Sequence, residues 1–220
     1  MGQSVLAADE KPLITNPIVE KAIRYELEKP TGELTKADLA KVTLLSLDDG
    51  PKITDADLKE LAKLQQLKVL NLGDTEITDV GLKEVAKCTQ LTLLDLEATQ
   101  ITDVGLKEVA KLQQLTHLWL YNTPITDAGL KELAKLQKLE LLVLGHTQIT
   151  DAGLKEVAKM QKLRGLSLDG TKITDAGLGD IAKLQKLTNL DLLGTKITKV
   201  GVAVLKKALP NCVILSNPKK

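Results

Sequence analysis

The sequence predicts an α/β solenoid, a curved horseshoe with a parallel sheet on its concave face and helices on its convex face. The first observation is a fixed period of 24 residues between recurring isoleucines, which is typical of a solenoid. The second is that each unit holds one helical pattern and one strand pattern. Because neighbouring strands lie about 4.8 Å apart and packed helices about 8–10 Å apart, stacked units bend with the strands inside. The isoleucines are Ile53, Ile77, Ile101, Ile125, Ile149, Ile173 and Ile197.

The unit at residues 125–144 shows both patterns. Its first half, T-D-A-G-L-K-E-L-A-K-L, begins with Thr126 and Asp127. Either residue can cap a helix, and the apolar residues that follow fall on one stripe of that helix. Its second half, L-E-L-L-V-L, alternates as a strand does, with Val143 between Leu142 and Leu144. Such short elements cannot bury their apolar sides alone, so we expect stacked units to share one continuous core.

A threonine follows each strand pattern, three residues after its last leucine. A column of buried hydroxyls at these positions can donate hydrogen bonds to the backbone of the turns. We therefore assign the threonines a structural role. They are Thr75, Thr99, Thr123, Thr147, Thr171 and Thr195.

The motifs L-x-x-L-x-L-x-x-T-x-I and I-T-D-x-G-L resemble those of the leucine-rich repeat family, over residues 42–215. The I-T-D-x-G-L helix start is similar to that of the ribonuclease-inhibitor-like and cysteine-containing subclasses. The resemblance implies a parallel sheet that lines the concave face, with helices on the convex side. The preceding stretch, N-P-I-V-E-K-A-I-R-Y-E-L-E-K-P-T-G-E-L-T-K-A-D-L-A-K, is similar to the N-terminal cap of bacterial internalin-like proteins of this family.

The chain divides into three stretches. Residues 1–15 are expected to be a disordered tail or a signal-peptide remnant. Residues 16–41 are expected to form a helical cap that covers the core and the sheet edge of the first repeat. Residues 42–220 are repeats that form one domain with the cap. The last repeat is atypical, because Lys199 replaces the usual aspartate, and 212–215 is its expected strand.

Within the cap, the pair Asn16-Pro17 predicts the start of a helix over residues 18–28. Its inward face would hold Val19, Ala22 and Ile23, together with either Leu27 or Tyr25. A second short helix is expected to end at residue 41. The first strand is expected at residues 44–47, and the turn after it carries Gly50-Pro51 in place of the usual threonine.

The composition limits the classes of partner and compartment. The 30 Lys and Arg residues nearly balance the 29 Asp and Glu residues, which argues against a nucleic-acid or membrane-binding surface. The sequence has no apolar run of about 20 residues that would span a membrane. The Val5-Leu6-Ala7 stretch fits the pattern that precedes signal-peptidase cleavage. We therefore expect an exported protein, with a disordered tag remnant as the alternative explanation of the same stretch.

The two cysteines are not expected to form a disulfide. Cys88 takes a helix position that other units fill with leucine, so it is expected to be a small buried side chain. Cys212 follows five repeats later, which places it about 24 Å away along the sheet. That distance is far beyond the reach of a disulfide.

The strand positions that point away from the core differ between units, whereas the helices and turns are nearly identical. Aromatic residues make up 1% of the chain, yet the Trp, both His and one of the two Tyr fall on these positions in two adjacent units. The expected register places Trp119 between Asp95 and Val143. An exposed aromatic group on an open face is typical of a binding hot spot, although such side chains can also simply cover the sheet.

The same positions carry acidic side chains and no lysine or arginine. An acidic concave face would steer a basic partner towards it; the alternative is a solvated acidic face without a ligand. The acidic residues are Asp48, Asp49, Asp74, Asp95, Glu97, Asp169 and Asp191. The candidate ligand-binding residues are Leu93, Asp95, Glu97, His117, Trp119, Tyr121, Asn122, Leu141, Val143, His146, Asp169 and Asp191.

Catalysis and metal binding are not indicated. Ser167 and His146 fall in adjacent repeats near aspartates, but no motif places them in a shared pocket with an oxyanion hole. His117, His146 and Asp95 lack the spacing of a metal site. We therefore predict a monomeric, non-enzymatic protein without metal or cofactor, which binds no nucleic acid and inserts into no membrane.

Three functions are consistent with this pattern. The first is recognition of a protein or peptide, which would be basic, on the concave face. The second is glycan binding, with Trp119 stacking on a sugar ring beside Asp95, Glu97 and Asn122. The third is a structural or designed repeat scaffold without a native ligand.

Overall fold

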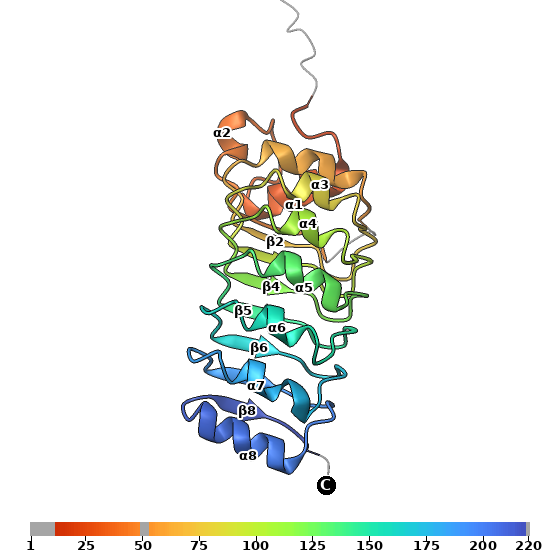
Figure 1. Cartoon of the computed structure of the whole chain (residues 1–220). Helices are drawn as coiled ribbons and strands as arrows, with labels where there is room; N and C mark the ends of the chain where they lie inside the picture. Colours follow the sequence, from red (N-terminus) through yellow and green to blue (C-terminus); the bar gives the residue numbers. More distant parts are fainter. Residues whose placement is uncertain (1–11, 49–52, 219–220) are drawn as a thin grey trace, which may run out of the picture.

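The computed structural model describes residues 12–48 and 53–218 and shows one stack of units along the chain (Figure 1). Within these ranges, eight strands form one parallel sheet whose strand order follows the sequence. Each strand holds three residues, and its partners are the strands of the neighbouring units. The strands are β1 (Leu44–Ser46), β2 (Val69–Asn71), β3 (Leu93–Asp95), β4 (His117–Trp119), β5 (Leu141–Val143), β6 (Gly165–Ser167), β7 (Asn189–Asp191) and β8 (Val213–Leu215).

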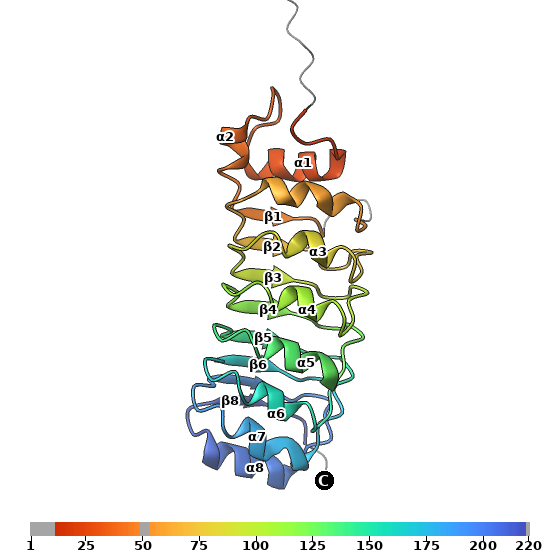
Figure 2. The ribbon, with the colours of Figure 1, turned by 45° about the horizontal axis from the view of Figure 1, so that its top comes forward.

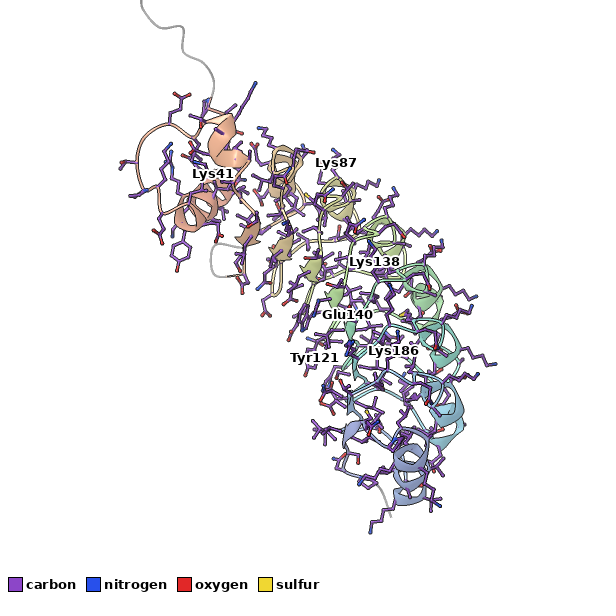
Figure 3. All side chains as sticks on the ribbon, turned by 90° about the vertical axis from the view of Figure 1, so that its left-hand side faces the viewer. Lys41, Lys87, Tyr121, Lys138, Glu140 and Lys186 are labelled. Carbon is purple, nitrogen blue, oxygen red and sulfur yellow. The ribbon has the colours of Figure 1, made fainter. Side chains whose placement is uncertain are left out.

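Short helices line the opposite side of the stack. Seen from the side, the strands follow the inner side of a shallow arc and the helices its outer side (Figure 3). The predicted α/β solenoid with a concave parallel sheet is therefore confirmed. After the N-terminal helices α1 (Pro17–Glu26) and α2 (Lys36–Leu39), the units contribute η1 (Asp57–Lys63), α3 (Leu82–Val85), α4 (Leu106–Val109), α5 (Asp127–Leu133), α6 (Leu154–Val157), η2 (Asp175–Gly177), α7 (Leu178–Ile181) and α8 (Lys199–Ala208).

The apolar side chains of all units form one continuous core, as the sequence predicts. In the unit that contains β5, Leu139, Leu142, Leu144 and Ile149 are at most 1% exposed. Cys88 is also buried, and both cysteines carry free thiols. Equivalent core positions therefore have the same buried surroundings in every unit, which explains why their residues are nearly identical along the sequence.

The predicted column of threonine hydroxyls is confirmed. Each of the six threonines is buried, and its Oγ1 donates to the carbonyl oxygen of the leucine three residues earlier at 2.5–2.7 Å. Thr147, for example, bonds to Leu144 of its own turn. Each hydroxyl thus closes the turn inside its own unit and makes no bond to the next threonine.

The aspartate of each I-T-D motif joins its own unit to the following one. Oδ1 of Asp103 accepts the backbone N–H of Thr126 at 2.9 Å, and Oδ2 accepts the Thr126 hydroxyl at 2.6 Å. We call this pair of bonds an aspartate staple. Further staples start from Asp55, Asp79, Asp127, Asp151 and Asp175.

The sequence analysis left open whether Thr126 or Asp127 caps the helix of its unit. The structure shows that Thr126 is the cap, because its Oγ1 accepts the backbone N–H of Ala128 at 3.3 Å. Asp127 instead reaches the next unit, where it staples Thr150. The sequence analysis missed this inter-unit role of the aspartate.

The staple also explains the glycine of I-T-D-x-G-L. A Cβ atom built on Gly129 would overlap with Oδ1 of Asp103 from the preceding unit. At the start of the stack the cap takes the place of a preceding unit, and Asp57 stands where later units have glycine. Asp57 accepts the side-chain amide of Asn16 at 2.5 Å, so it ties the first unit to the cap.

The N-terminal helices lie across the first unit (Figure 2). Asn16 caps α1 as predicted, since its Oδ1 accepts the backbone N–H groups of Ile18 and Val19 at 3.0 Å. The inward side chain at the end of the helix is Leu27, which is partly buried, whereas Tyr25 is 86% exposed.

Residues 12–15 differ from the disordered tail expected over residues 1–15. Ile14 is 1% exposed in the core. The hydroxyl of Thr15 donates to Glu60 of η1 at 2.6 Å. This short segment is therefore held against the first unit. The predictions for residues 1–11, 49–52 and 219–220, which include Val5-Leu6-Ala7, Asp49 and Gly50-Pro51, lie outside the described residues.

The last unit ends the series of staples. Lys199 stands at the staple position, and α8 extends to ten residues. The final strand β8 forms at Val213–Leu215, within the predicted stretch, and pairs with β7.

Each turn that follows one of the strands β2 to β7 contains one residue in the left-handed conformation. The φ angles at this position are +53° to +70°, and the residues are Asp74, Ala98, Asn122, His146, Gly170 and Gly194. The backbone N–H of the left-handed residue bonds to the next unit, as the N–H groups of the strand do. That of Asn122, for example, donates to the Gly145 carbonyl at 2.9 Å. Glycine and asparagine tolerate this conformation, whereas an alanine there costs about 1–2 kcal/mol.

We expect Asp103→Ala to lower the free energy of unfolding by about 2–3 kcal/mol, because it leaves the part-buried donors of Thr126 without an acceptor. Urea denaturation measures this loss. Glu108→Gln is the control, since it removes only an exposed pairing with Lys111, and should cost no more than about 0.5 kcal/mol. Equal losses in the two variants would show that the staple adds nothing beyond a surface contact.

We expect Ala98→Gly to raise the free energy of unfolding by about 0.5–1 kcal/mol, because relief of the positive φ exceeds the entropy that glycine loses on folding. Thermal and urea unfolding measure the gain. The matched control is Ala110→Gly at the end of α4, where φ is −61°. This control should lower stability by about 1 kcal/mol; a similar loss from Ala98→Gly would contradict the assignment of strain to residue 98.

Candidate functional site

The sheet register brings the predicted site residues onto adjacent strands. Trp119 pairs with Asp95 on one side and with Val143 on the other. In the parallel row, His117 lies between Leu93 and Leu141. The predicted register is confirmed, and Tyr121 projects from the inner side of the arc (Figure 3).

The four aromatic side chains form two pairs. The rings of His117 and Trp119 lie 6.0 Å apart between centroids and stack at an interplanar angle of 18°. The rings of Tyr121 and His146 lie 5.0 Å apart and meet edge to face at 61°. The Nδ1 atom of His117 also lies 2.8 Å from the hydroxyl of Thr116. The sequence analysis treated these residues as one cluster and could not separate the pairs.

Three large side chains lean over glycines of the following unit. A Cβ atom on Gly145 would lie 2.8 Å from the Tyr121 ring, and one on Gly165 would lie 2.5 Å from Leu141. The His146 ring covers Gly170 in the same way. Tyr121, Leu141 and His146 therefore help to cover the sheet, which is one of the two roles that the sequence left open for them.

Four acidic residues lie close together in the N-terminal half of the concave face, and they are Asp48, Asp74, Asp95 and Glu97. Burial raises the pKa of the Asp95 carboxyl, and the charges of Asp48 and Asp74 raise it further. Burial and the charges of Asp95 and Asp74 likewise raise the pKa of Glu97. Across residues 12–48 and 53–218, no lysine or arginine forms an ion pair with these four carboxylates. Their negative potential is therefore left for a partner to neutralise.

Some of these polar residues also shape the turns. Oδ1 of Asp95 accepts the backbone N–H of Glu97 at 2.9 Å. Asn71 makes the same bond to Gly73, and Asp191 makes it to Leu193. The sequence analysis considered Asp95 and Asp191 only as surface charges. A signal for this role was present in the sequence. Asn or Asp recurs at the last position of several strands, where its side-chain oxygen can accept the backbone N–H of the residue two positions later.

Asp169 lies between Ser167 and His146, the two residues that could suggest a hydrolase. The Ser167 hydroxyl donates to Oδ1 of Asp169 at 2.5 Å, while Nε2 of His146 lies 3.7 Å from Oδ2. The serine proton thus points to a carboxylate rather than to the imidazole that would have to remove it. This order of groups does not form a nucleophile and base pair.

Residues of the described strands line hollows at both ends of the concave face. The N-terminal hollow, of about 320 Å³, is bounded by residues of β1 to β4 that include Leu44, Val69, Asp95 and Trp119. The C-terminal hollow, of about 160 Å³, is bounded by β5 to β8 and includes Asp191. Leu44 and Val69 are not among the candidate ligand-binding residues that the sequence indicates.

The described residues also limit the kinds of site that this chain can hold. They contain no cluster of three or more His, Cys, Asp or Glu side chains that could hold a metal ion. None of their helices has the length and apolar character needed to cross a membrane. A third hollow, of about 600 Å³, lies on the outer side of α1 beside Tyr25 and is lined by both acidic and basic side chains.

The sequence profile described as a leucine-rich repeat region matches residues 37–204. The chain belongs to the leucine-rich repeat family. Among solved structures, this leucine-rich repeat chain is 27% identical to internalin C2 from Listeria monocytogenes, with a TM-score of 0.68, covering 92% of this chain and 93% of that one. No curated protein sequence matched.

Two further solved structures share the leucine-rich repeat fold. An internalin, InlF, from Listeria monocytogenes is 20% identical, with a TM-score of 0.54 over 93% of this chain and 71% of that one. A leucine-rich repeat protein of Leptospira interrogans is 25% identical, with a TM-score of 0.59 over 82% of this chain and 51% of that one. The present chain thus spans about half of the Leptospira protein.

We expect Asp95→Asn to stabilise the leucine-rich repeat domain at pH 7 by at most about 1 kcal/mol, because the carboxyl is partly exposed and water screens the repulsion. Since folding raises its pKa above 3.8, the charged form opposes folding above the folded-state pKa. The gain should therefore fade as the pH falls through that pKa towards 3.8. Urea denaturation at pH 7 and pH 3.5 measures both values.

The matched control for this titration is Asp191→Asn, which alters an aspartate with the same turn bond. Its row neighbours are the uncharged Ser167 and Leu215. The control should change stability little at either pH. A gain at Asp95 that persists at pH 3.5 would show that charge repulsion is not its cause.

Proposed function

We propose that this protein is a non-enzymatic recognition module that binds a basic protein or peptide on its concave face. The observation that carries the proposal is the group of carboxylates around Asp95 and Glu97, which lies beside Trp119 without a cationic partner among the described residues. Leucine-rich repeat domains are generally protein-binding modules, which supports the same conclusion.

The distribution of charge supports a basic partner. One lysine of each repeated helix pairs with an acidic residue three positions earlier, as Lys135 does with Glu132 at 2.5 Å. Lys87 lies on the outer side of the arc, whereas Tyr121 lies on the inner side (Figure 3). The balanced net charge of the chain thus hides an acidic inner surface, which favours encounter with a positive partner.

The size of the sheet fits a macromolecular ligand. Seven spacings between eight strands give a length of roughly 34 Å. A protein partner of ordinary size covers about 800 Å² on each side, which requires flanking rows as well as the aromatic pairs. We therefore place the contact over the candidate residues from Leu93 to Asp191.

Glycan binding is the alternative. It is favoured by the stacked pair of His117 and Trp119, because an aromatic platform beside carboxylates can stack on a sugar ring and bond its hydroxyl groups. Such a ligand would need only the central strands. A scaffold without a native ligand is the third possibility, and it predicts no specific binding to either class.

Three narrower statements remain predictions from the sequence. These are the ribonuclease-inhibitor-like or cysteine-containing subclass, a monomeric state, and export from the cytoplasm. The similarity to Listeria internalins is consistent with export, while Val5-Leu6-Ala7 lies outside the described residues.

The test is selection of a displayed library of random peptides, and probing of a glycan array, with the wild-type protein and with Trp119→Ala. We expect peptides rich in Lys and Arg, whose affinity falls by about 10-fold or more in Trp119→Ala. Lys131→Ala, on the convex side of the next unit, is the control and should leave their affinity unchanged. The double variant Asp95→Asn with Glu97→Gln should weaken the salt dependence of binding.

Two outcomes would contradict the proposal. Binding of glycans alone, lost entirely in Trp119→Ala, would establish the alternative. Ligands that bind all variants equally, or no ligand from either collection, would show that the concave face is not the recognition surface.

A further inference from the structure

The N-terminal hollow combines an apolar floor with a rim that carries the carboxylate of Asp95. Its floor consists of Leu44, Val69 and Leu93, which occupy one row on three adjacent strands. Leu44 is 39% exposed. Trp119 on the fourth strand closes the hollow towards the C-terminal end. An apolar surface of this kind gains free energy when a ligand removes it from water.

The rim of the hollow offers an unused hydrogen-bond acceptor. Asp48 uses one oxygen for the Ser46 hydroxyl and the other for the Asn71 amide. Asp95 uses Oδ1 for the backbone N–H of Glu97. Among the described residues, no group donates a hydrogen bond to Oδ2 of Asp95. A half-buried carboxylate oxygen beside an indole ring is therefore available to a donor from outside the chain.

The shape and the charge together select one kind of side chain. A long aliphatic stem is needed to cover the floor, and a cationic end is needed to reach the carboxylates. Both lysine and arginine meet these conditions. Arginine fits better, because its planar guanidinium stacks on aromatic faces, is weakly hydrated, and donates several hydrogen bonds in one plane.

We propose that the N-terminal hollow binds an arginine side chain of the partner, with its stem on Leu44 and Leu93 and its guanidinium between Trp119 and Asp95. This inference rests on the proposed function and narrows it to a partner with an exposed arginine. The C-terminal hollow lacks this combination, since no aromatic residue bounds it beside Asp191. The arginine site is therefore specific to one end of the concave face.

The test uses the peptide acetyl-Gly-Gly-Arg-Gly-Gly-amide and versions with citrulline, norleucine or lysine at the central position. Citrulline keeps the shape of arginine and removes its charge. Because Trp119 is the single tryptophan of the chain, its indole N–H gives one NMR signal that reports on the hollow. We expect a saturable shift with the arginine peptide, with a Kd on the order of 1 mM. Binding should be at least threefold weaker with lysine and at least 10-fold weaker with citrulline and norleucine.

Two matched variants locate the site. Asp95→Asn should weaken binding of the arginine peptide at least fivefold. The turn itself should persist, since Asn71 makes the same backbone bond with an asparagine side chain. Asp191→Asn changes an aspartate with the same turn bond in the other hollow, and it should alter the Kd by less than twofold.

Four results would overturn the arginine site. They are the absence of a saturable shift, equal binding of the citrulline and arginine peptides, binding of lysine at least as tight as that of arginine, and equal effects of the two aspartate variants. These results are distinguishable from failure of the proposed function. If selected library peptides bind through Trp119 but contain no arginine, protein recognition stands and the arginine site is wrong.

Discussion

The aspartate staple is the interaction on which the regularity of this solenoid depends. The carboxylate of Asp103 reaches across a unit boundary and holds both the backbone and the hydroxyl of Thr126. The same contact excludes any side chain at Gly129. One aspartate thus determines two other residues of the next unit, and the repetition of I-T-D-x-G-L follows from that geometry. The buried threonine hydroxyls, such as that of Thr147, differ from the staples because each closes a turn within its own unit.

This division of tasks leaves the concave positions free to vary. The staples, the buried leucines and the threonine hydroxyls fix the spacing of the strands, so the regular stacking does not depend on the side chains between the leucines. Where such a side chain does bond to another unit, as the Asn71 amide does to Asp48, the bond is not repeated in every unit. Trp119, Asp95 and Val143 can therefore follow one another in a single row. The face still has constraints of its own. Bulky Tyr121 and Leu141 are accommodated because the following unit offers glycine beneath each of them.

The fold was predictable because its information is repeated. The period of 24 residues sets the strand register, and the register correctly placed Trp119 beside Asp95 and Val143. What the sequence could not supply depends on the direction of individual side chains. The turn bond of Asp95, the association of His146 with Tyr121 and the hollow beside Leu44 arise once each or in a few units. Burial of Ile14 was likewise not predicted, because the N-terminal segment is not a repeat. Its contacts join residues far apart in the sequence, such as Thr15 and Glu60.

The staples also give the stack a direction. Every staple runs from an aspartate to a threonine of the next unit, so each unit completes the bonding of the one before it. During synthesis, the most recently made unit therefore carries a carboxylate whose donors have not yet left the ribosome. Each addition satisfies one such group and creates another, until Lys199 ends the series. The series of staples thus closes at α8, and a nascent chain that stops within the stapled units lacks the donors for its last aspartate.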